Sequence, residues 1–198
     1  MRYDYDGKNV IVTGATGGIG KEVAKGIIAG GGSVALIGLT LDEANKVAAE
    51  LGEHAHPYAM DQSNRDAVDT TFQQILDDFG RIDVLINVAG KIGGGLLGTT
   101  AYASSKAGLN GFTKAIAKEG AKYGIYANAV CPSFTHTGMT AALEADPQKR
   151  QRVLSMIPLG RGAAPAEIAQ MILFFGCDAA SFITGEIGDC DGGIVMDG

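Results

Sequence analysis

Short apolar runs alternate along this chain with segments in which apolar residues recur every three or four positions. The first run is 10–12, and Ile19, Val23 and Ile27 behind it have the spacing of one helix face. This alternation continues to residue 188, which is typical of βαβ units and a parallel sheet. We expect further strands at 34–37, before 61, at 82–88, 125–131 and 186–188, and helices at 41–51, 63–79, 101–122, 138–154 and 165–175.

Polar residues mark where several of these elements begin. Thr40 and Glu43 have the spacing of a capping box, in which the threonine accepts from a backbone N–H and the glutamate reaches back. Ser63 is the candidate cap of the helix that Gly80 ends. Residues 82–88 are nearly all apolar, which predicts a strand buried on both faces.

Composition excludes several classes of partner. The net charge is −6 and the sequence pI about 5.0, so the chain lacks the basic footprint of a nucleic-acid-binding protein. No apolar run reaches the ~18 residues of a membrane span, and the first residues do not resemble a secretion signal. The cysteines, Cys131, Cys177 and Cys190, are widely spaced. We therefore expect a cytoplasmic protein with no disulfide framework and no metal, membrane or nucleic-acid partner.

A glycine-rich turn at 13–20 lies between the first expected strand and the first expected helix. Glycine there lets the backbone approach a pyrophosphate, and the start of the helix presents N–H donors. The same glycines could serve only a tight turn, but the strand before and the helix after favour a dinucleotide site. The candidate binding residues are Gly14, Thr16, Gly17, Gly18, Ile19 and Gly20.

Five motifs in order along the chain resemble those of the short-chain dehydrogenases/reductases. They are the turn at 13–20, Asn87-Val88-Ala89-Gly90, Tyr102-Ala103-Ser104-Ser105-Lys106, 128–133 with Thr137 beyond it, and Asp191-Gly192-Gly193. The resemblance runs from Lys8 to Gly193. It implies an α/β fold of the Rossmann type, a doubly wound parallel sheet in three αβα layers, with residues 1–198 forming a single dinucleotide-binding domain.

The same resemblance implies where the rest of the cofactor binds. Ser133 stands where the family has a glycine, which changes the expected backbone there. By resemblance, adenine is held by Asp61 and Gln62, the adenosine ribose is lined by Asn87, Ala89 and Gly90, and the nicotinamide end is faced by Pro132 and Thr137.

The end of the second strand bears on the choice between NAD and NADP. NAD-using relatives carry an acid there, and this chain has Gly38; NADP users place a basic residue nearby, and this chain has Leu39 and Thr40. Losing one hydrogen-bonding acid costs less than leaving a phosphate dianion unpaired. The expected cofactor is NAD or NADP, with NAD favoured, and an acid at position 38 is expected to strengthen NAD binding.

Tyr102 and Lys106 are four residues apart, on one face of an expected helix. A nearby ammonium stabilises a phenolate, which makes the phenol a usable acid or base near neutral pH. A surface helix with a solvated lysine would show the same spacing. By resemblance, Tyr102 is the catalytic acid/base, Lys106 assists it, and both contact the cofactor.

The family has a further unit between its Asn-Asn-Ala-Gly motif and the catalytic tyrosine, bearing an asparagine and a serine of the active site. Here only residues 91–101 lie in that interval, and Ala89 stands thirteen before Tyr102, where the serine belongs. The sequence as given therefore lacks this unit, and we favour residues omitted from the sequence over a true deletion; only with a true deletion would the fold lack one central βα unit. A right-handed crossover from 82–88 to 125–131 would still close one sheet.

These features favour an oxidoreductase that moves hydride between NAD(P) and a secondary alcohol or ketone. The alternatives are a catalytically weak or inactive nucleotide-binding protein, acting as a sensor or interaction module, and a structural subunit. By resemblance, the helix at 101–122 is a contact between copies in a homodimer or homotetramer.

Overall fold

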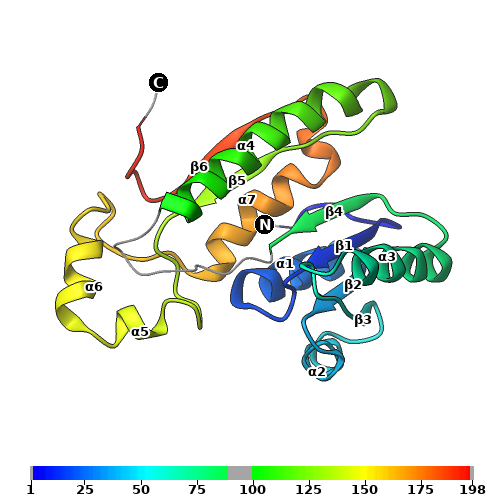
Figure 1. Ribbon diagram of the computed structural model, residues 1–198, viewed down its shortest axis with the longest axis horizontal. Coiled ribbons are helices and arrows are strands. Elements are labelled where there is room, and N and C mark those ends of the chain that lie inside the picture. The colour runs from blue at the N-terminus through cyan, green and yellow to red at the C-terminus, as the bar shows by residue number, and fades with distance from the viewer. Residues whose placement is uncertain (1, 89–99, 197–198) are drawn as a thin grey trace.

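The computed structural model describes residues 2–88 and 100–196, with only the backbone of 101 and 102 (Figure 1). Strands and helices alternate as the apolar pattern predicts. The strands are β1 (Asn9–Thr13), β2 (Ser33–Gly38), β3 (Ala55–Ala59), β4 (Val84–Asn87), β5 (Ala129–Pro132) and β6 (Ile187–Cys190). The helices are α1 (Gly18–Ala29), α2 (Leu41–Leu51), α3 (Arg65–Phe79), α4 (Thr100–Gly120), α5 (Ala141–Glu144), α6 (Pro147–Leu154) and α7 (Pro165–Phe175), with short 3₁₀ turns at Ala121–Tyr123 and Asp178–Ala180.

The described strands form two parallel sheets. One has the order β3-β2-β1-β4, and the other pairs β5 with β6. Parallel pairing runs in register from Val10 with Val34 and Val84 on its two sides, and from Ala129 with Ile187 in the second sheet. The predicted parallel α/β fold is confirmed, but the crossover from 82–88 to 125–131 does not close one sheet among the described strands, because β4 and β5 share no ladder.

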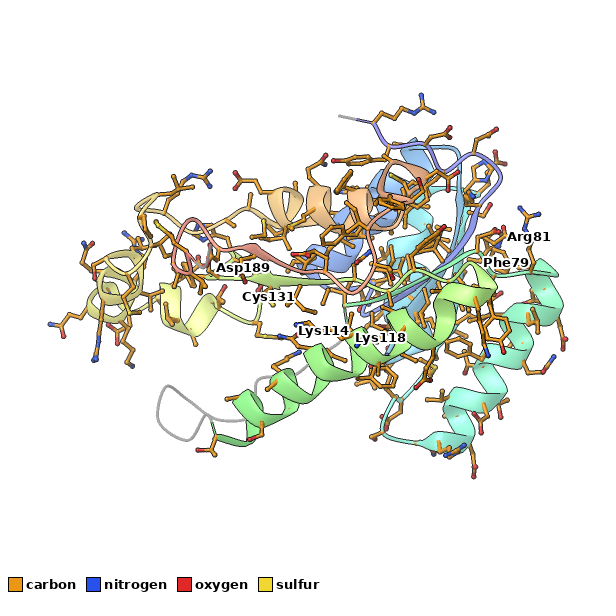
Figure 2. All side chains as sticks on the ribbon, turned by 90° about the horizontal axis from the view of Figure 1, so that it is seen from above. Phe79, Arg81, Lys114, Lys118, Cys131 and Asp189 are labelled. Atoms are coloured by element: carbon orange, nitrogen blue, oxygen red, sulfur yellow. The ribbon has the colours of Figure 1, made fainter. Side chains whose placement is uncertain are left out.

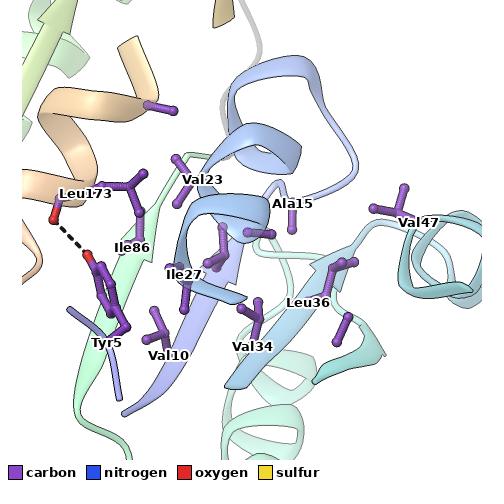
Figure 3. Packing of buried hydrophobic residues seen from close by; sticks show 14 of the residues in the cluster. Tyr5, Val10, Ala15, Val23, Ile27, Val34, Leu36, Val47, Ile86 and Leu173 are labelled. Atoms are coloured by element: carbon purple, nitrogen blue, oxygen red, sulfur yellow. Dashed lines mark hydrogen bonds between the residues drawn. The ribbon is translucent and has the colours of Figure 1, made fainter. Parts of the chain in front are cut away.

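A helical layer on one side connects the two sheets. Helices α1 and α7 pack against each other, and α7 also lies against β5. Between this layer and the first sheet is the larger core cluster, in which Val12, Ile27 and Leu36 are fully buried (Figure 3). Tyr5 anchors α7 to this core by donating its hydroxyl hydrogen to the carbonyl oxygen of Leu173, over 2.9 Å.

Helices α3 and α4 lie on the opposite side of the strands from α1 and α7, which gives three layers (Figure 2). The inner face of α3 packs on the first sheet through Phe72, Ile75 and Phe79, as the helical spacing predicts. By contrast α4 is mostly exposed, and Thr113 and Ala117 are its most deeply buried side chains among those described. No helix in the described ranges is long and apolar enough to cross a membrane.

Strand β4 differs most from the expectation. The apolar run 82–88 predicts burial on both faces, but only Ile86 is buried within the strand, and Leu85 is 46% exposed. The reason is that β4 is an edge strand among the strands that the structure describes, where it pairs with β1 on one side.

Two local predictions are also corrected. The helix α3 is capped by Asn64, whose side chain accepts from the N–H of Ala67, because Ser63 instead bonds the carboxylate of Asp61. The strand expected from 125 begins only at Ala129. At α2 the Thr40 hydroxyl does accept from the Glu43 N–H, as half of a capping box requires.

Candidate dinucleotide site

The glycine turn joins β1 to α1 in the way that its sequence predicts. Gly14 has φ +66°, a conformation that favours glycine, and its carbonyl accepts from the N–H of Gly17. Gly17 caps α1 and offers no side-chain acceptor, so the first N–H groups of the helix are left to another acceptor. The start of α1 can therefore hold an anion such as a phosphate.

Close contacts require glycine at position 20 and place Gly18 beside a distant segment. A methyl group at Gly20 would overlap the carbonyl oxygen of Gly14 and lie 2.8 Å from Cα of Ala15. A methyl group at Gly18 would lie 3.2 Å from Cγ2 of Thr137 and 3.5 Å from Cγ of Pro165. The structure thus brings the turn together with Thr137, more than a hundred residues away in the sequence. Thr16 and Ile19 lie half-buried beside them.

Gly38 is buried at the end of β2, and space around it is short. A methyl group there would lie 2.9 Å from Cγ2 of Thr16 and 3.1 Å from the carbonyl oxygen of Thr40. The expectation that an acid at position 38 simply strengthens NAD binding is therefore corrected, because Thr16 already fills that space.

Charges near this strand end are paired. Lys21, the first cation after the turn, forms an ion pair with Glu50 of α2. The Lys21 hydrogen bond is the main reason that the pKa of Glu50 is lowered. Leu39, next to Gly38, is 58% exposed. The residue directly after Gly38 thus presents an apolar side chain to the solvent.

The residues expected at the adenosine end follow β3 and β4. Asp61 and Gln62 are exposed just after β3, and the Asp61 carboxylate accepts from the N–H and hydroxyl of Ser63. Asn87 ends β4, and its side-chain oxygen accepts from the hydroxyl of Thr13, at the end of β1, over 3.3 Å. Ala89 and Gly90 lie outside the described residues.

Tyr102 and Lys106 both lie on α4, as predicted, although the Tyr102 side chain lies outside the described part. The Lys106 ammonium acts only weakly on Cys131 of β5, whose pKa is set mainly by other causes. Burial of the Cys131 thiol, followed by the Asp189 carboxylate on the paired strand, raises that pKa and outweighs Lys106. Figure 2 shows Cys131 and Asp189 near one another beside α4.

The chain after β5 is held by contacts that the sequence did not reveal. Pro132, the last residue of β5, is exposed, and beyond it the N–H of His136 bonds the carbonyl of Ala163, over 2.9 Å. Arg161 and Glu167 form two hydrogen bonds of 2.7 Å, and Glu167 also accepts from the N–H of Ala164. These bonds, with that of Arg161 first, lower the pKa of Glu167 to about 2.

The bond from His136 to Ala163 connects the Thr137 segment to the loop that carries Pro165, and both Thr137 and Pro165 lie beside Gly18 at the start of α1. The bonded residues are six positions apart (Arg161 and Glu167) and twenty-seven positions apart (His136 and Ala163) in the sequence, and no local pattern predicts either pairing. Only the helix start at Pro165, with Glu167 three residues after the cap Ala164, was a visible signal.

A parallel sheet between helical layers, with a glycine turn at the start of its first helix, defines a Rossmann-type nucleotide-binding protein. Residues 8–96 match the family model described as short chain dehydrogenase, and residues 93–195 match that described as Enoyl-(Acyl carrier protein) reductase. The chain belongs to the short-chain dehydrogenase/reductase family, and it is an NAD(P)-dependent oxidoreductase of that family.

Individual relatives agree with this assignment. The chain is 33% identical to the 3-oxoacyl-[acyl-carrier-protein] reductase FabG of Thermotoga maritima, over 96% of this chain and 99% of the relative. It is 30% identical to that of Aquifex aeolicus, over 98% and 100%. A crystal structure of a short-chain dehydrogenase/reductase, glucose/ribitol dehydrogenase, from Brucella melitensis superposes with a TM-score of 0.91 at 25% identity, covering 100% of both chains.

Proposed function

We propose that this chain transfers hydride between NAD(P) and a secondary alcohol or ketone, with Tyr102 as the acid/base and Lys106 as its partner. The observation that carries the proposal is the contact between the glycine turn and the Thr137 segment. It places the glycine turn, the proposed phosphate site, beside the segment that follows β5. The two curated relatives named above are 3-oxoacyl-[acyl-carrier-protein] reductases, and a 3-oxoacyl group contains a ketone.

The cofactor fits the residues present. The first turn of α1 would hold the pyrophosphate, since its N–H groups have no capping side chain. Asp61 and Gln62 would hold the adenine, Asn87 with Ala89 and Gly90 the adenosine ribose, and Pro132 and Thr137 the nicotinamide. We further infer that residues 1–198 act as one dinucleotide-binding domain.

We favour NAD over NADP on the charges beside Gly38. Lys21 is already paired with Glu50, and Leu39 presents an apolar side chain to the solvent. A 2′-phosphate beside this strand end would have to compete with Glu50 for Lys21, because β2 itself offers no cation. The prediction is measured by titrating both nucleotides, and tighter binding of NADP would contradict it.

When it is bound, nicotinamide supplies or takes the hydride. The chain has to move the accompanying proton, and the Tyr102 phenol is suited to this when an ammonium one helical turn away stabilises the phenolate. Lys106 has the required spacing, and it lies close enough to the end of β5 to act on Cys131.

The experiment compares Tyr102→Phe with Tyr123→Phe, a matched loss of a hydroxyl at a residue that is 71% exposed after α4. We expect Tyr102→Phe to lower ketone reduction at least about a hundredfold while nucleotide binding is kept, since a proton-transfer group contributes 10²–10⁴-fold. Tyr123→Phe should turn over as the unchanged chain does.

The alternative of a nucleotide-binding protein with little turnover predicts equal, low rates in all three proteins, with binding intact. That result would refute the proposed role of Tyr102.

We also propose that copies associate through α4 as a homodimer or homotetramer. Its outward stripe of small residues, Gly108, Gly111 and Ala115, leaves room for close helix packing, since nothing lies within 4 Å of a methyl group at either glycine. Light scattering that finds a monomer at tens of micromolar would contradict this.

A further inference from the structure

Two strand edges are left open between the sheets. β4 is paired only with β1, and β5 only with β6, among the described strands. A parallel strand uses alternate N–H and C=O groups toward each neighbour, so each of these strands presents one unused row. Such edges attract further strands unless something covers them.

The two open rows face the same place in the fold. Helices α1 and α7 pack together behind them, α1 on the first sheet and α7 on β5, which keeps the sheets next to each other. The connection from β4 to β5 through α4 is a parallel crossover, and its right-handed form puts β5 on the side of β4 away from β1. A strand entering between them would pair with both.

Apolar side chains surround this place on the side of α3 and α4. Leu85 of β4 is 46% exposed, Leu76 of α3 is 43% exposed, and Leu109 and Phe112 of α4 are 47% and 61% exposed. On α4, Thr113 and Ala117 define the buried face, and the helical spacing and the crossover's hand put Leu109 and Phe112 on the flank toward β4. We call Leu76, Leu85, Leu109 and Phe112 the open face.

A helix as exposed as α4 also needs a partner. It contains glycines at 108 and 111 within its interior, each costing about 1 kcal/mol relative to alanine. In proteins, most of the stability of a helix comes from packing of its apolar face against other elements. Exposed apolar groups gathered from three elements indicate a surface that another polypeptide covers.

The relatives indicate which kind of polypeptide fits. The alignment with the Thermotoga maritima protein runs over 247 positions, more than the 198 residues of this chain, and includes 99% of that relative. The relative therefore has residues without a counterpart here. A strand that is parallel to both neighbours must arrive through a crossover, so the fitting unit is one strand followed by a helix.

We propose that a strand–helix segment of another chain binds to the edges of β4 and β5 and to the open face. Its strand has apolar residues on both faces and pairs with β4 and β5, and its amphipathic helix covers Leu76, Leu85, Leu109 and Phe112. This is strand addition to a sheet edge combined with a helix on an apolar face. This binding does not depend on the proposed hydride transfer, and it can be measured without turnover.

The probe is a synthetic peptide with the longest stretch of the Thermotoga maritima relative that aligns opposite no residue of this chain. Hydrogen exchange of the whole 198-residue chain is followed with and without it. We expect saturable binding that slows exchange at Val84–Asn87 and Ala129–Pro132 at least tenfold. A copy of the peptide with alternate strand amides methylated on one edge should bind at least tenfold more weakly, because it cannot donate to that edge.

Phe112→Asp tests the open face with little risk to folding, because that side chain is mostly exposed. It should weaken peptide binding at least tenfold, whereas Phe182→Asp, at a fully exposed residue outside the open face, should leave it unchanged. Absence of binding, equal binding of the methylated peptide, or equal effects of the two substitutions would refute the proposal. Slow hydrogen exchange at both strands in the chain alone would also refute the proposal. If that protection depended on protein concentration, a second copy would cover the edges, and if it did not, the chain itself would cover them.

Discussion

Gly20 is where one added methyl group should separate nucleotide binding from folding. Its Cα faces the turn so closely that the β-carbon of an alanine would overlap the carbonyl oxygen of Gly14. The same β-carbon would lie 2.8 Å from Cα of Ala15, so both obstacles are backbone atoms. Backbone cannot rotate away as a side chain can, and the start of α1 must therefore move relative to the turn.

The size of the effect follows from that movement. Relief of the overlap requires a displacement on the order of 1 Å, and overpacking of this kind costs about 1–3 kcal/mol of stability. The N–H groups at the start of α1 move with the helix, and each hydrogen bond to a charged phosphate contributes about 1.5–3 kcal/mol. Losing one or two of them should weaken NAD binding by at least about tenfold in Gly20→Ala. In Gly20→Asp, binding should be lost, because a carboxylate would face the pyrophosphate as well.

Calorimetric titration of NAD measures this, with circular dichroism at the same temperature to show that the variant is folded. Gly111→Ala is the matched control, since nothing lies within 4 Å of a methyl group at that residue and it is far from the turn in sequence. It should bind NAD normally, whatever it does to the proposed packing of copies through α4. Unchanged affinity in folded Gly20→Ala would mean that the turn does not hold the nucleotide.

Three further predictions concern the neighbourhood of the site. Gly38→Asp should weaken NAD binding, because its β-carbon would lie 2.9 Å from Cγ2 of Thr16; a calorimetric titration that matches the unchanged chain would contradict this. Arg161 lowers the pKa of Glu167 from 4.5 to about 2, so the contribution of the Glu167 carboxylate to stability is complete above pH 4.5 and is lost as the pH falls through 2. The difference in urea midpoint between the unchanged chain and Glu167→Gln should therefore shrink over that range. A difference that stays constant with pH would exclude the ion pair as its cause. Tyr5→Phe removes the buried hydrogen bond to Leu173 and should lower the free energy of unfolding by about 1 kcal/mol, measured by urea denaturation, with Tyr126→Phe at an exposed site as control.

The first half of the chain was predictable because its signals are local. Periodic apolar residues give β1, α1, β2 and α2 within a residue or two, and the glycines of the turn stand where their contacts require them. The Thr40 cap was visible from spacing alone. At the next helix, Ser63 and Asn64 are both good caps, and only the acceptor Asp61 decides between them, which sequence spacing does not show.

The second half was less predictable because its contacts are distant in sequence. The run 82–88 is apolar enough for a strand buried on both faces, yet burial depends on a neighbour that the run itself does not specify. The clamp that joins His136 to Ala163 and Arg161 to Glu167 has no periodic signature. The contact of Gly18 with Thr137 follows from that clamp, so it too needed the structure.

The open edge of β4 shows why an apolar sequence pattern and the observed burial can differ. An apolar sequence retained at Leu85 makes physical sense where the strand is covered in the working protein, since a half-exposed leucine beside an unused row of amides favours aggregation. The glycine turn and the Thr137 segment do not depend on that cover, because α1, α7 and the Arg161–Glu167 pair hold them from the other side of the sheet. Nucleotide binding should therefore survive changes at Phe112 that abolish binding of the strand–helix segment. The converse holds for Gly20, whose loss should leave the edges of β4 and β5 able to bind.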